Sequence, residues 1–180
     1  DVYKRQDLGG AVFNKDGLNI PELFKHIAKN PSVKGFQGGE DYEGEILEIE
    51  CDVLIPAAVG GVITSSNAGK IKTSVLIEGA NSPTTLNADK ILRENGVMII
   101  PDILANAGGI TASYFEWVQN TQNYLWKETE LHEKLIDVML TSFEEVWTIS
   151  QKQNCDLRTA ALIKGIKRVA AAKLTRGLFP

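Results

Sequence analysis

Three loop segments of this sequence carry residues that could hold a flat organic ligand. The segment Pro56-Ala57-Ala58 offers small side chains, which let the backbone approach such a ligand closely. The other two segments place an asparagine beside glycine or alanine, at Asn81 and at Asn106. An asparagine amide provides both a donor and an acceptor, which is what a carboxamide such as that of nicotinamide requires. Each asparagine could instead merely end a strand and cap the next helix.

The loop that contains Asn106 runs directly into a helix-like segment after Gly108-Gly109. Free backbone N–H groups in the first turn of a helix favour an anion, and Thr111 and Ser113 add hydroxyl groups there. A bound carboxylate and simple helix capping explain this pattern equally well. Asp7 is a further candidate, because an acid that ends the second strand of a dinucleotide fold accepts the hydroxyls of the adenosine ribose. The Gly-x-Gly-x-x-Gly phosphate loop of such folds is not in the sequence.

Three apolar runs precede the ligand-binding loops and must position them. These runs, at residues 52–56, 74–78 and 97–101, are nearly continuous in Val, Leu and Ile, which is typical of strands buried on both faces of a parallel sheet. Helix-like stretches separate them, one with caps at residues 63–68 and one that starts at Thr84. This alternation predicts an α/β fold with a doubly wound sheet, which binds ligands beyond the carboxyl ends of its strands.

Further helices are predicted before and after these strands along the chain. A short amphipathic helix starts at Pro21, and two longer ones run from residues 110 to 120 and from 128 to about 152. A last helix is capped by Asp156 and closed by Gly177. Apolar residues repeat at helical spacing in the last two helices, and we expect them to be packing stripes. They are Leu131, Leu135, Val138, Met139, Phe143, Val146, Trp147, Ala160, Ala161, Ile163, Ile166, Val169 and Ala170.

Composition argues against several classes of function. The 180 residues carry a formal net charge of −4, which is not the charge of a nucleic-acid-binding protein. No apolar run reaches the roughly 20 residues that cross a bilayer, and we expect no export signal. Cys51 and Cys155 are too far apart for a CxxC site, and no cluster has the spacing of metal ligands. We therefore expect a cytoplasmic protein without a nucleic-acid, membrane or metal partner.

Longer motifs surround the candidate residues. They are Glu78-Gly79-Ala80-Asn81, Ile100-Pro101-Asp102-Ile103-Leu104-Ala105-Asn106-Ala107-Gly108-Gly109, Ser113-Tyr114-Phe115-Glu116-Trp117 and Arg158-Thr159-Ala160-Ala161. These motifs resemble the nucleotide-binding domain of glutamate dehydrogenases, within the family that also includes leucine, phenylalanine and valine dehydrogenases. The Ser-Tyr-Phe-Glu-Trp run favours the glutamate enzymes, and a fragment of one of the sister dehydrogenases is the alternative. The resemblance implies a partial Rossmann-like parallel sheet followed by carboxy-terminal helices.

The resemblance assigns cofactor-binding roles to five residues. Asp7 corresponds to the acid that contacts the adenine ribose. Ala57 and Ala58 correspond to the small residues that line the cofactor cleft, and Asn81 and Asn106 to asparagines near the nicotinamide and its ribose. The implied cofactor is NAD or NADP. An acid at Asp7 would repel a 2′-phosphate and therefore favours NAD.

On the substrate side, the resemblance assigns two residues and no catalytic one. Ser113 corresponds to a serine that helps hold the substrate side-chain carboxylate, and Ile110 to an apolar wall of that pocket. The catalytic lysine of the family matches nothing in this sequence. We therefore expect a carboxy-terminal fragment, inactive alone, of a homo-hexameric enzyme that deaminates L-glutamate to 2-oxoglutarate and ammonia. A non-catalytic nucleotide-binding module is the other interpretation.

We expect three parts along the chain. Residues 1–6 are polar and match no helix or strand period, so we interpret them as a non-native or frayed lead. Residues 7–120 would form a partial NAD(P)-binding domain, and residues 121–180 would form carboxy-terminal helices that pack back on it. A sheet without its first strands would have an unpaired edge, which favours aggregation.

Overall fold

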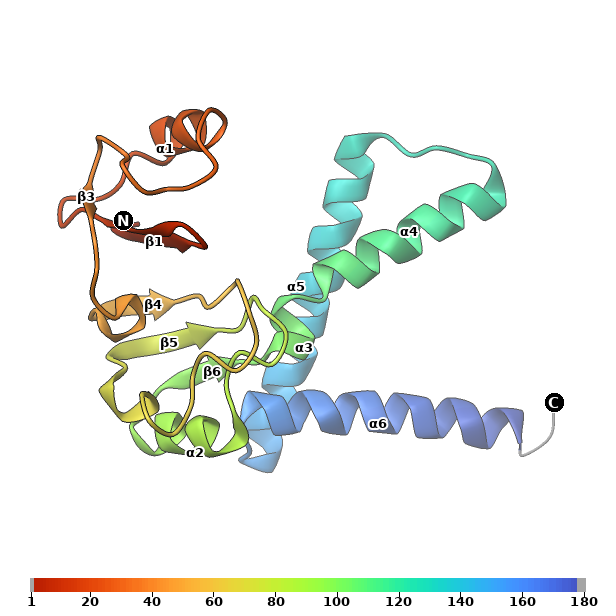
Figure 1. The fold of residues 1–180 in the computed structure, drawn as a ribbon. Coiled ribbons are helices and arrows are strands. Elements are labelled where there is room, and N and C mark those ends of the chain that lie inside the picture. The colour runs from red at the N-terminus through yellow and green to blue at the C-terminus, as the bar shows by residue number, and fades with distance from the viewer. Residues whose placement is uncertain (1, 178–180) are drawn as a thin grey trace. The chain divides into compact units, whose positions relative to one another are not determined.

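The computed structural model describes residues 2–177, and the chain divides into two compact units (Figure 1). The first unit comprises the chain up to Cys51 together with residues 70–72, and the second comprises residues 52–69 and the chain from Thr73 onward. Among the described residues, no helix is long and apolar enough to cross a membrane.

The first unit is a three-stranded antiparallel sheet with one helix. Strands β1 (Lys4–Asp7) and β2 (Gly10–Phe13) form a hairpin, and β3 (Glu40–Asp41) pairs with the other side of β2. Helix α1 (Ile20–Ile27) is capped by the side chain of Asn19, and proline occupies its first turn as predicted. The core of this unit consists of Val12, Leu18, Leu23, Val33 and Phe36.

The amino-terminal lead differs from our expectation of a frayed segment. Residues Lys4 to Asp7 pair in register with β2. The Lys4 ammonium group also donates to the carbonyl oxygens of Ile46 and Ile49, at 3.1 and 2.9 Å, around the 3-10 turn η1 (Ile46–Glu48). The partner strand, with buried Ala11 and Val12, orders a segment whose own residues are polar. These four polar residues show no strand pattern of their own, and they form a strand because they pair with β2.

The second unit contains the parallel sheet that the sequence predicts. Strands β4 (Cys51–Leu54), β5 (Thr73–Ile77) and β6 (Met98–Ile100) lie in the order β4-β5-β6. Strands β5 and β6 pair in parallel, and the three arrows point the same way in Figure 1. The carboxyl ends of all three strands therefore meet at one edge of the sheet, and the prediction of an α/β fold is confirmed.

The predicted helix between β5 and β6 is present, and longer helices follow the sheet. Helix α2 (Leu86–Glu94) is capped by the Thr85 hydroxyl, which accepts from the N–H of Ala88 at 3.4 Å. It ends just before Gly96, whose φ of 81° lies in the left-handed region that glycine tolerates. The remaining helices are α3 (Asp102–Ala105), α4 (Gly108–Gln122), α5 (Glu128–Gln153) and α6 (Leu157–Arg176).

The prediction of a helix between β4 and β5 is wrong. The segment contains turns and only a three-residue 3-10 helix, η2 (Ala68–Lys70). The Asn67 side chain accepts from the N–H of Thr64 at 2.8 Å and donates to the carbonyl of Val62 at 2.8 Å. Because the side chain satisfies backbone groups that a helix would have used, the local turn replaces the helix.

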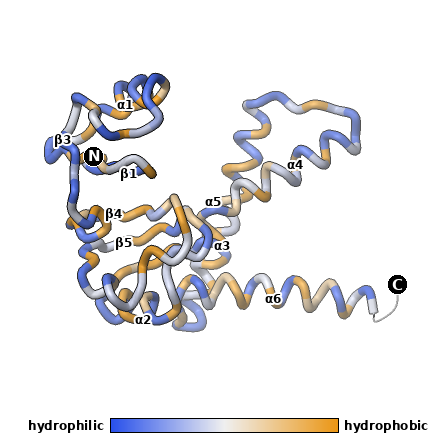
Figure 2. Tube along the Cα trace, viewed as in Figure 1, coloured by the Kyte–Doolittle hydropathy of each residue, from blue (hydrophilic) through white to orange (hydrophobic). Residues whose placement is uncertain are grey.

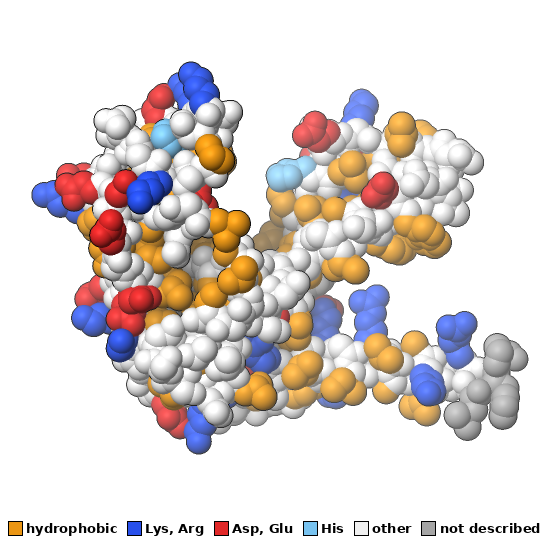
Figure 3. Space-filling model, viewed as in Figure 1, with side chains coloured by type: hydrophobic (Ala, Val, Ile, Leu, Met, Phe, Trp, Pro, Cys, Tyr) orange, Lys and Arg blue, Asp and Glu red, His pale blue; other side chains and the backbone are white. Residues whose placement is uncertain are grey.

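Helices α5 and α6 pack together near their junction. There Leu104 of α3, Val146 of α5, and Leu157 and Ala160 of α6 form a buried cluster. As predicted, Asp156 caps α6, and the helix ends at Gly177. From residue 165 onward every described residue of α6 is exposed, and apolar side chains recur among basic ones along this helix (Figures 2 and 3). Much of the predicted packing stripe is therefore open to solvent.

Candidate functional site

Asn81 and Asn106 meet at the carboxyl edge of the parallel sheet. The Nδ2 group of Asn106 donates to Oδ1 of Asn81 at 2.8 Å, and it lies 3.5 Å from the carbonyl oxygen of Gly79. Asn81 is exposed and Asn106 is half-buried. Within residues 2–177, the amide donor of Asn81 and the amide oxygen of Asn106 have no protein partner. The pair therefore retains an unpaired donor on Asn81 and an unpaired acceptor on Asn106, the two kinds of group that a carboxamide can bond.

The loop after β4 brings Ala57 against the same edge. The N–H of Ala80 donates to the carbonyl oxygen of Pro56 at 2.9 Å, so this loop and the loop after β5 are bonded directly. A Cβ atom on Gly79 would lie 3.0 Å from the Cβ of Ala57, which is tighter than an ordinary contact. The missing Cβ of Gly79 thus allows this close approach to Ala57. Ala57 and the neighbouring Ala58 are exposed, which leaves the surface accessible to a ligand.

The backbone around Asn81 is held on both sides. A Cβ atom on Gly60 would lie 2.8 Å from the carbonyl oxygen of Asn81, and the N–H of Gly61 donates to the carbonyl oxygen of Ser82 at 2.9 Å. Ser82 has a left-handed φ of 45°, and its N–H donates to Oδ2 of Asp102 at 2.8 Å. A serine rarely adopts this conformation unless its surroundings impose it. The surrounding loops therefore determine the position of the Asn81 backbone.

The two predicted substrate residues lie on the first turns of α4. The Ser113 hydroxyl donates to the carbonyl oxygen of Gly109 at 3.0 Å, and the Thr111 hydroxyl donates to that of Ala107 at 2.9 Å. Both hydroxyl groups thus donate their hydrogens to backbone carbonyls four residues earlier. Ser113 is exposed, and 75% of the surface of Ile110 is open to solvent. Both predicted substrate residues are therefore accessible on one helix.

Asp7 lies at the end of β1 in the first unit. Its Oδ1 accepts from the N–H groups of Gly9 and Gly10 and from the Ser32 hydroxyl, at 2.8, 3.2 and 2.8 Å. Its Oδ2 accepts, within the described part of the chain, only from the N–H of Val33, at 2.6 Å. Burial raises the pKa of Asp7, but these hydrogen bonds outweigh burial and hold the pKa below its ordinary value. Asp7 is therefore an anion at neutral pH, with room for one more donor at Oδ2.

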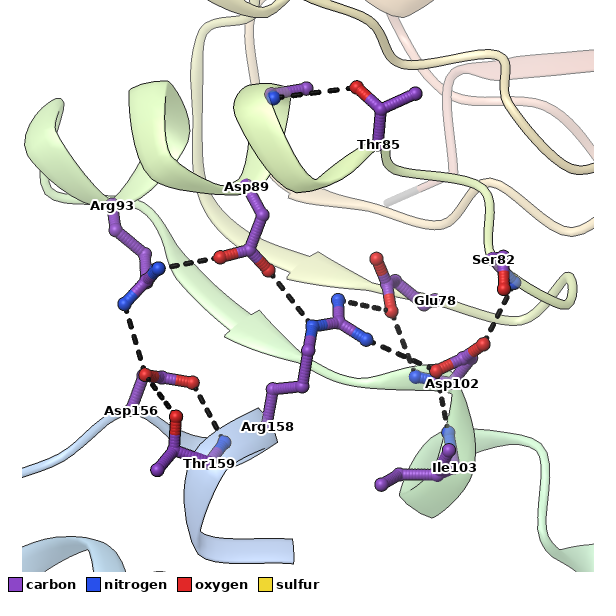
Figure 4. A network of polar contacts seen from close by, with 11 residues as sticks. Glu78, Ser82, Thr85, Asp89, Arg93, Asp102, Ile103, Asp156, Arg158 and Thr159 are labelled. Carbon is purple, nitrogen blue, oxygen red and sulfur yellow. Dashed lines mark hydrogen bonds and ion pairs between the residues drawn. The ribbon is translucent and has the colours of Figure 1, made fainter. Parts of the chain in front are cut away.

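A charge network that the sequence analysis missed lies where the two segments that carry Asn81 and Asn106 begin; we call these segments, residues 78–82 and 101–109, the asparagine loops (Figure 4). Arg158, in the first turn of α6, donates through Nη2 to Glu78 at 2.8 Å, through Nη1 to Asp102 at 3.2 Å and through Nε to Asp89 at 3.0 Å. Desolvation lowers the pKa of Arg158, but the hydrogen bonds and charges of Glu78 and Asp89 outweigh it and raise the pKa. One guanidinium group thus joins the carboxylates of Glu78, just after β5, of Asp89 in α2 and of Asp102 in α3.

Arg93 of α2 extends this network to the cap of α6. It donates to Asp89 at 2.7 Å and to Asp156 at 3.0 Å, and Asp156 also accepts from the N–H and hydroxyl of Thr159. Desolvation raises the pKa of Asp156, but the bonds from Thr159 and the charge of Arg93 outweigh it and lower the pKa. The start of α6 is therefore attached to the sheet region through two arginines.

Glu78 is the most deeply buried acid of this network, with 0% of its surface exposed. Its Oε1 has no partner within the described part of the chain, and its Oε2 accepts from Arg158 and from the N–H of Asp102. One sequence signal pointed to such a partner. Glu78 directly follows β5 and Asp102 lies two residues after β6, and an acid that is buried at such a position is costly unless a cation compensates it. Nothing in the local spacing identifies Arg158 as that cation.

The family profile of glutamate/leucine/phenylalanine/valine dehydrogenase matches residues 2–177. The catabolic NAD-specific glutamate dehydrogenase RocG of Bacillus subtilis is 46% identical over 171 residues, which are 95% of this chain and 40% of that relative. Glutamate dehydrogenase of Thermotoga maritima is 42% identical over 180 residues, or 99% of this chain and 43% of the relative. The chain thus spans about 40% of the length of these curated relatives.

Solved structures of glutamate dehydrogenases share the fold described above. The hetero-hexameric enzyme from Thermus thermophilus, in a Leu-bound form, matches with a TM-score of 0.86 and 26% identity over 95% of this chain and 40% of that chain. The enzyme from Peptoniphilus asaccharolyticus matches with a TM-score of 0.78 and 33% identity over 94% of this chain and 38% of that chain.

Proposed function

Because the chain belongs to the glutamate/leucine/phenylalanine/valine dehydrogenase family, we propose that it supplies the nicotinamide-binding surface of a glutamate dehydrogenase. The observation that carries this proposal is the hydrogen-bonded pair of Asn81 and Asn106, which lies beside Ala57. The unpaired donor and acceptor of the pair complement the carboxamide of NAD or NADP. The pair also lies where open parallel sheets bind their ligands, beyond the carboxyl ends of the strands.

The residues of this chain would act by orientation. When bound, the nicotinamide cofactor supplies the hydride-transfer chemistry. Asn81 and Asn106 would fix the plane of the carboxamide, and the small side chains of Ala57 and Ala58 would leave space for the ring. Ser113 would hold the side-chain carboxylate of the substrate once its hydroxyl turns away from the Gly109 carbonyl.

We further propose a preference for NAD over NADP. The lowered pKa of Asp7 keeps its carboxylate charged, and a carboxylate repels a 2′-phosphate. Its Oδ2 atom, which can accept one more hydrogen bond, would accept from a ribose hydroxyl. The description of the Bacillus subtilis relative as NAD-specific supports this preference.

We also propose that these 180 residues do not turn over glutamate by themselves. The Asn81–Asn106 edge presents amides and small residues, and its nearest acids, Glu78 and Asp102, are bound to Arg158. Among residues 2–177, this edge would therefore lack a group placed to move a proton to or from a substrate. The complete protein would act on L-glutamate and 2-oxoglutarate, as the names of the curated relatives support, and would oxidise leucine or valine more slowly. Its assembly would be hexameric, as described for the Thermus neighbour.

A titration with NADH, followed by nicotinamide fluorescence, tests the site. We expect Asn81→Ala and Asn106→Ala each to weaken NADH binding by about 1 kcal/mol, or roughly fivefold, because each removes one hydrogen bond. Asn95→Ala is the control, since Asn95 is exposed at the end of α2. Unchanged affinity in both site variants would exclude this assignment. Robust amination of 2-oxoglutarate by the 180-residue chain would refute the proposed inactivity.

A further inference from the structure

We propose that Arg158 is a positioning residue for the Asn81–Asn106 pair, so that the start of α6 determines the geometry of the cofactor-facing edge. The inference rests on the proposed function, which gives that pair its ligand. The three groups that Arg158 contacts are the carboxylates of Glu78, Asp89 and Asp102, and neither asparagine is among them. Its influence must therefore pass through those acids.

Glu78 and Asp102 lie near the starts of the two asparagine loops. Glu78 directly follows β5 and precedes Asn81 by three residues, and Asp102 opens α3 and precedes Asn106 by four. A hydrogen bond joins the two loops at this point, because Oε2 of Glu78 accepts from the N–H of Asp102 at 2.9 Å. Any change in the separation of these acids therefore changes the separation of the loops.

Asp102 also holds the backbone of both loops. Its Oδ2 accepts from the N–H of Ser82, the residue after Asn81, at 2.8 Å. Its Oδ1 accepts from the N–H of Ile103 at 2.8 Å and from Arg158 at 3.2 Å. The left-handed conformation of Ser82 therefore depends on a carboxylate whose other oxygen is bound to Arg158.

Arg158 makes this arrangement possible because it compensates two neighbouring buried anions. Glu78 is 0% exposed and Asp102 is 8% exposed, and like charges in such surroundings repel each other strongly. The planar guanidinium places Nη1 on one acid and Nη2 on the other, so its fixed shape also sets the distance between them. A lysine ammonium carries the same charge but lacks this planar fork.

Arg93 offers a matched control. It shares Asp89 with Arg158, and it also binds the start of α6, through Asp156. The carboxylates that it contacts are Asp89 and Asp156, and it has no ion pair with Glu78 or Asp102 among residues 2–177. A purely stabilising role for the network predicts similar effects from both arginines at the asparagine pair, whereas positioning predicts an effect from Arg158 alone.

NMR of the side-chain amides in the ¹⁵N-labelled chain, without any cofactor, tests the inference. The Asn81 and Asn106 amides are assigned by their loss in Asn81→Ala and Asn106→Ala. We expect Arg158→Gln to shift both amides as the bond between them weakens. We expect Arg158→Lys to shift them in the same direction, and Arg93→Gln to leave them in place.

Unshifted amides in Arg158→Gln, or equal shifts in Arg93→Gln, would overturn the inference. If Arg158→Gln does not fold, Arg158→Lys decides, and unshifted amides in that variant overturn it as well. This measurement does not depend on cofactor binding. Absence of NADH binding would therefore refute the proposed function alone, and unshifted amides together with intact NADH binding would refute the positioning role alone.

Discussion

At the scale of single residues, the completely buried Glu78 makes Arg158 essential to stability. Removal of one partner of a buried ion pair leaves the other charge uncompensated, which costs about 3–5 kcal/mol. We expect Arg158→Met to lower the free energy of unfolding by about this amount in urea denaturation. Lys90→Met is the control, because the Lys90–Glu94 pair is exposed, at 3.8 Å, and such pairs contribute at most about 1 kcal/mol. Equal losses in the two variants would contradict the expected difference.

The cap of α6 predicts a dependence of stability on pH. The pKa of Asp156 in the folded protein is lowered from its ordinary value of 3.8. Its contribution is therefore fully present above that value and is lost as the pH falls through the lower, folded pKa. Asp156→Asn keeps a capping oxygen but cannot ionise. We expect the wild-type advantage in urea denaturation to be constant near neutral pH and to shrink below about pH 4. An advantage that grows on acidification would reverse the assigned sign.

At the scale of elements, the sequence predicts those features that have local causes. The three parallel strands were predictable from apolar runs, and α6 from its cap at Asp156 and its terminal Gly177. The β1–β2 hairpin was not, because its first strand is polar and its pairing depends on a partner strand. The prediction of a helix capped at residues 63–68 was wrong because the Asn67 side chain bonds to the backbone there.

The candidate site shows the same division. The meeting of Asn81 and Asn106 follows from the rule that parallel strands end at one edge, and the structure places their amides in contact. Their roles toward a cofactor, like those of Asp7 and Ser113, stay predictions. Arg158 could not be found in this way, since it joins an acid 80 residues away and no local period records such a contact.

The contact between the loops after β4 and β5 gives a prediction for Gly60. A Cβ atom there would lie 2.8 Å from the carbonyl oxygen of Asn81, a backbone atom that cannot move aside easily. We expect Gly60→Ala to destabilise the protein by about 1–3 kcal/mol, as overpacking does, and to lower its thermal midpoint. Gly69→Ala is the control, since a Cβ at Gly69 meets no atom within 4 Å. Unchanged stability in Gly60→Ala would show that the loops can separate freely.

At the scale of the whole molecule, the division into two compact units predicts unequal local stability. The first unit comprises only about 50 residues, and small units bury a lower fraction of their surface. We expect the amides of β2 to exchange with deuterium faster than those of β5, although Val12 and Leu76 are both fully buried. Hydrogen exchange measured by mass spectrometry distinguishes the two strands. Equal protection in both, with one sharp thermal transition, would instead indicate a single cooperative unit.

The charge network also has a consequence for protein engineering. A graft of residues 78–109 from one relative onto another would transfer Glu78, Asp89 and Asp102 together with both asparagines. It would leave Arg158 behind, since that residue belongs to a distant part of the sequence. Chimaeras designed to alter cofactor selectivity should therefore exchange the first turn of α6 together with these loops. For the same reason, we expect evolution to have changed the three acids and Arg158 as a group.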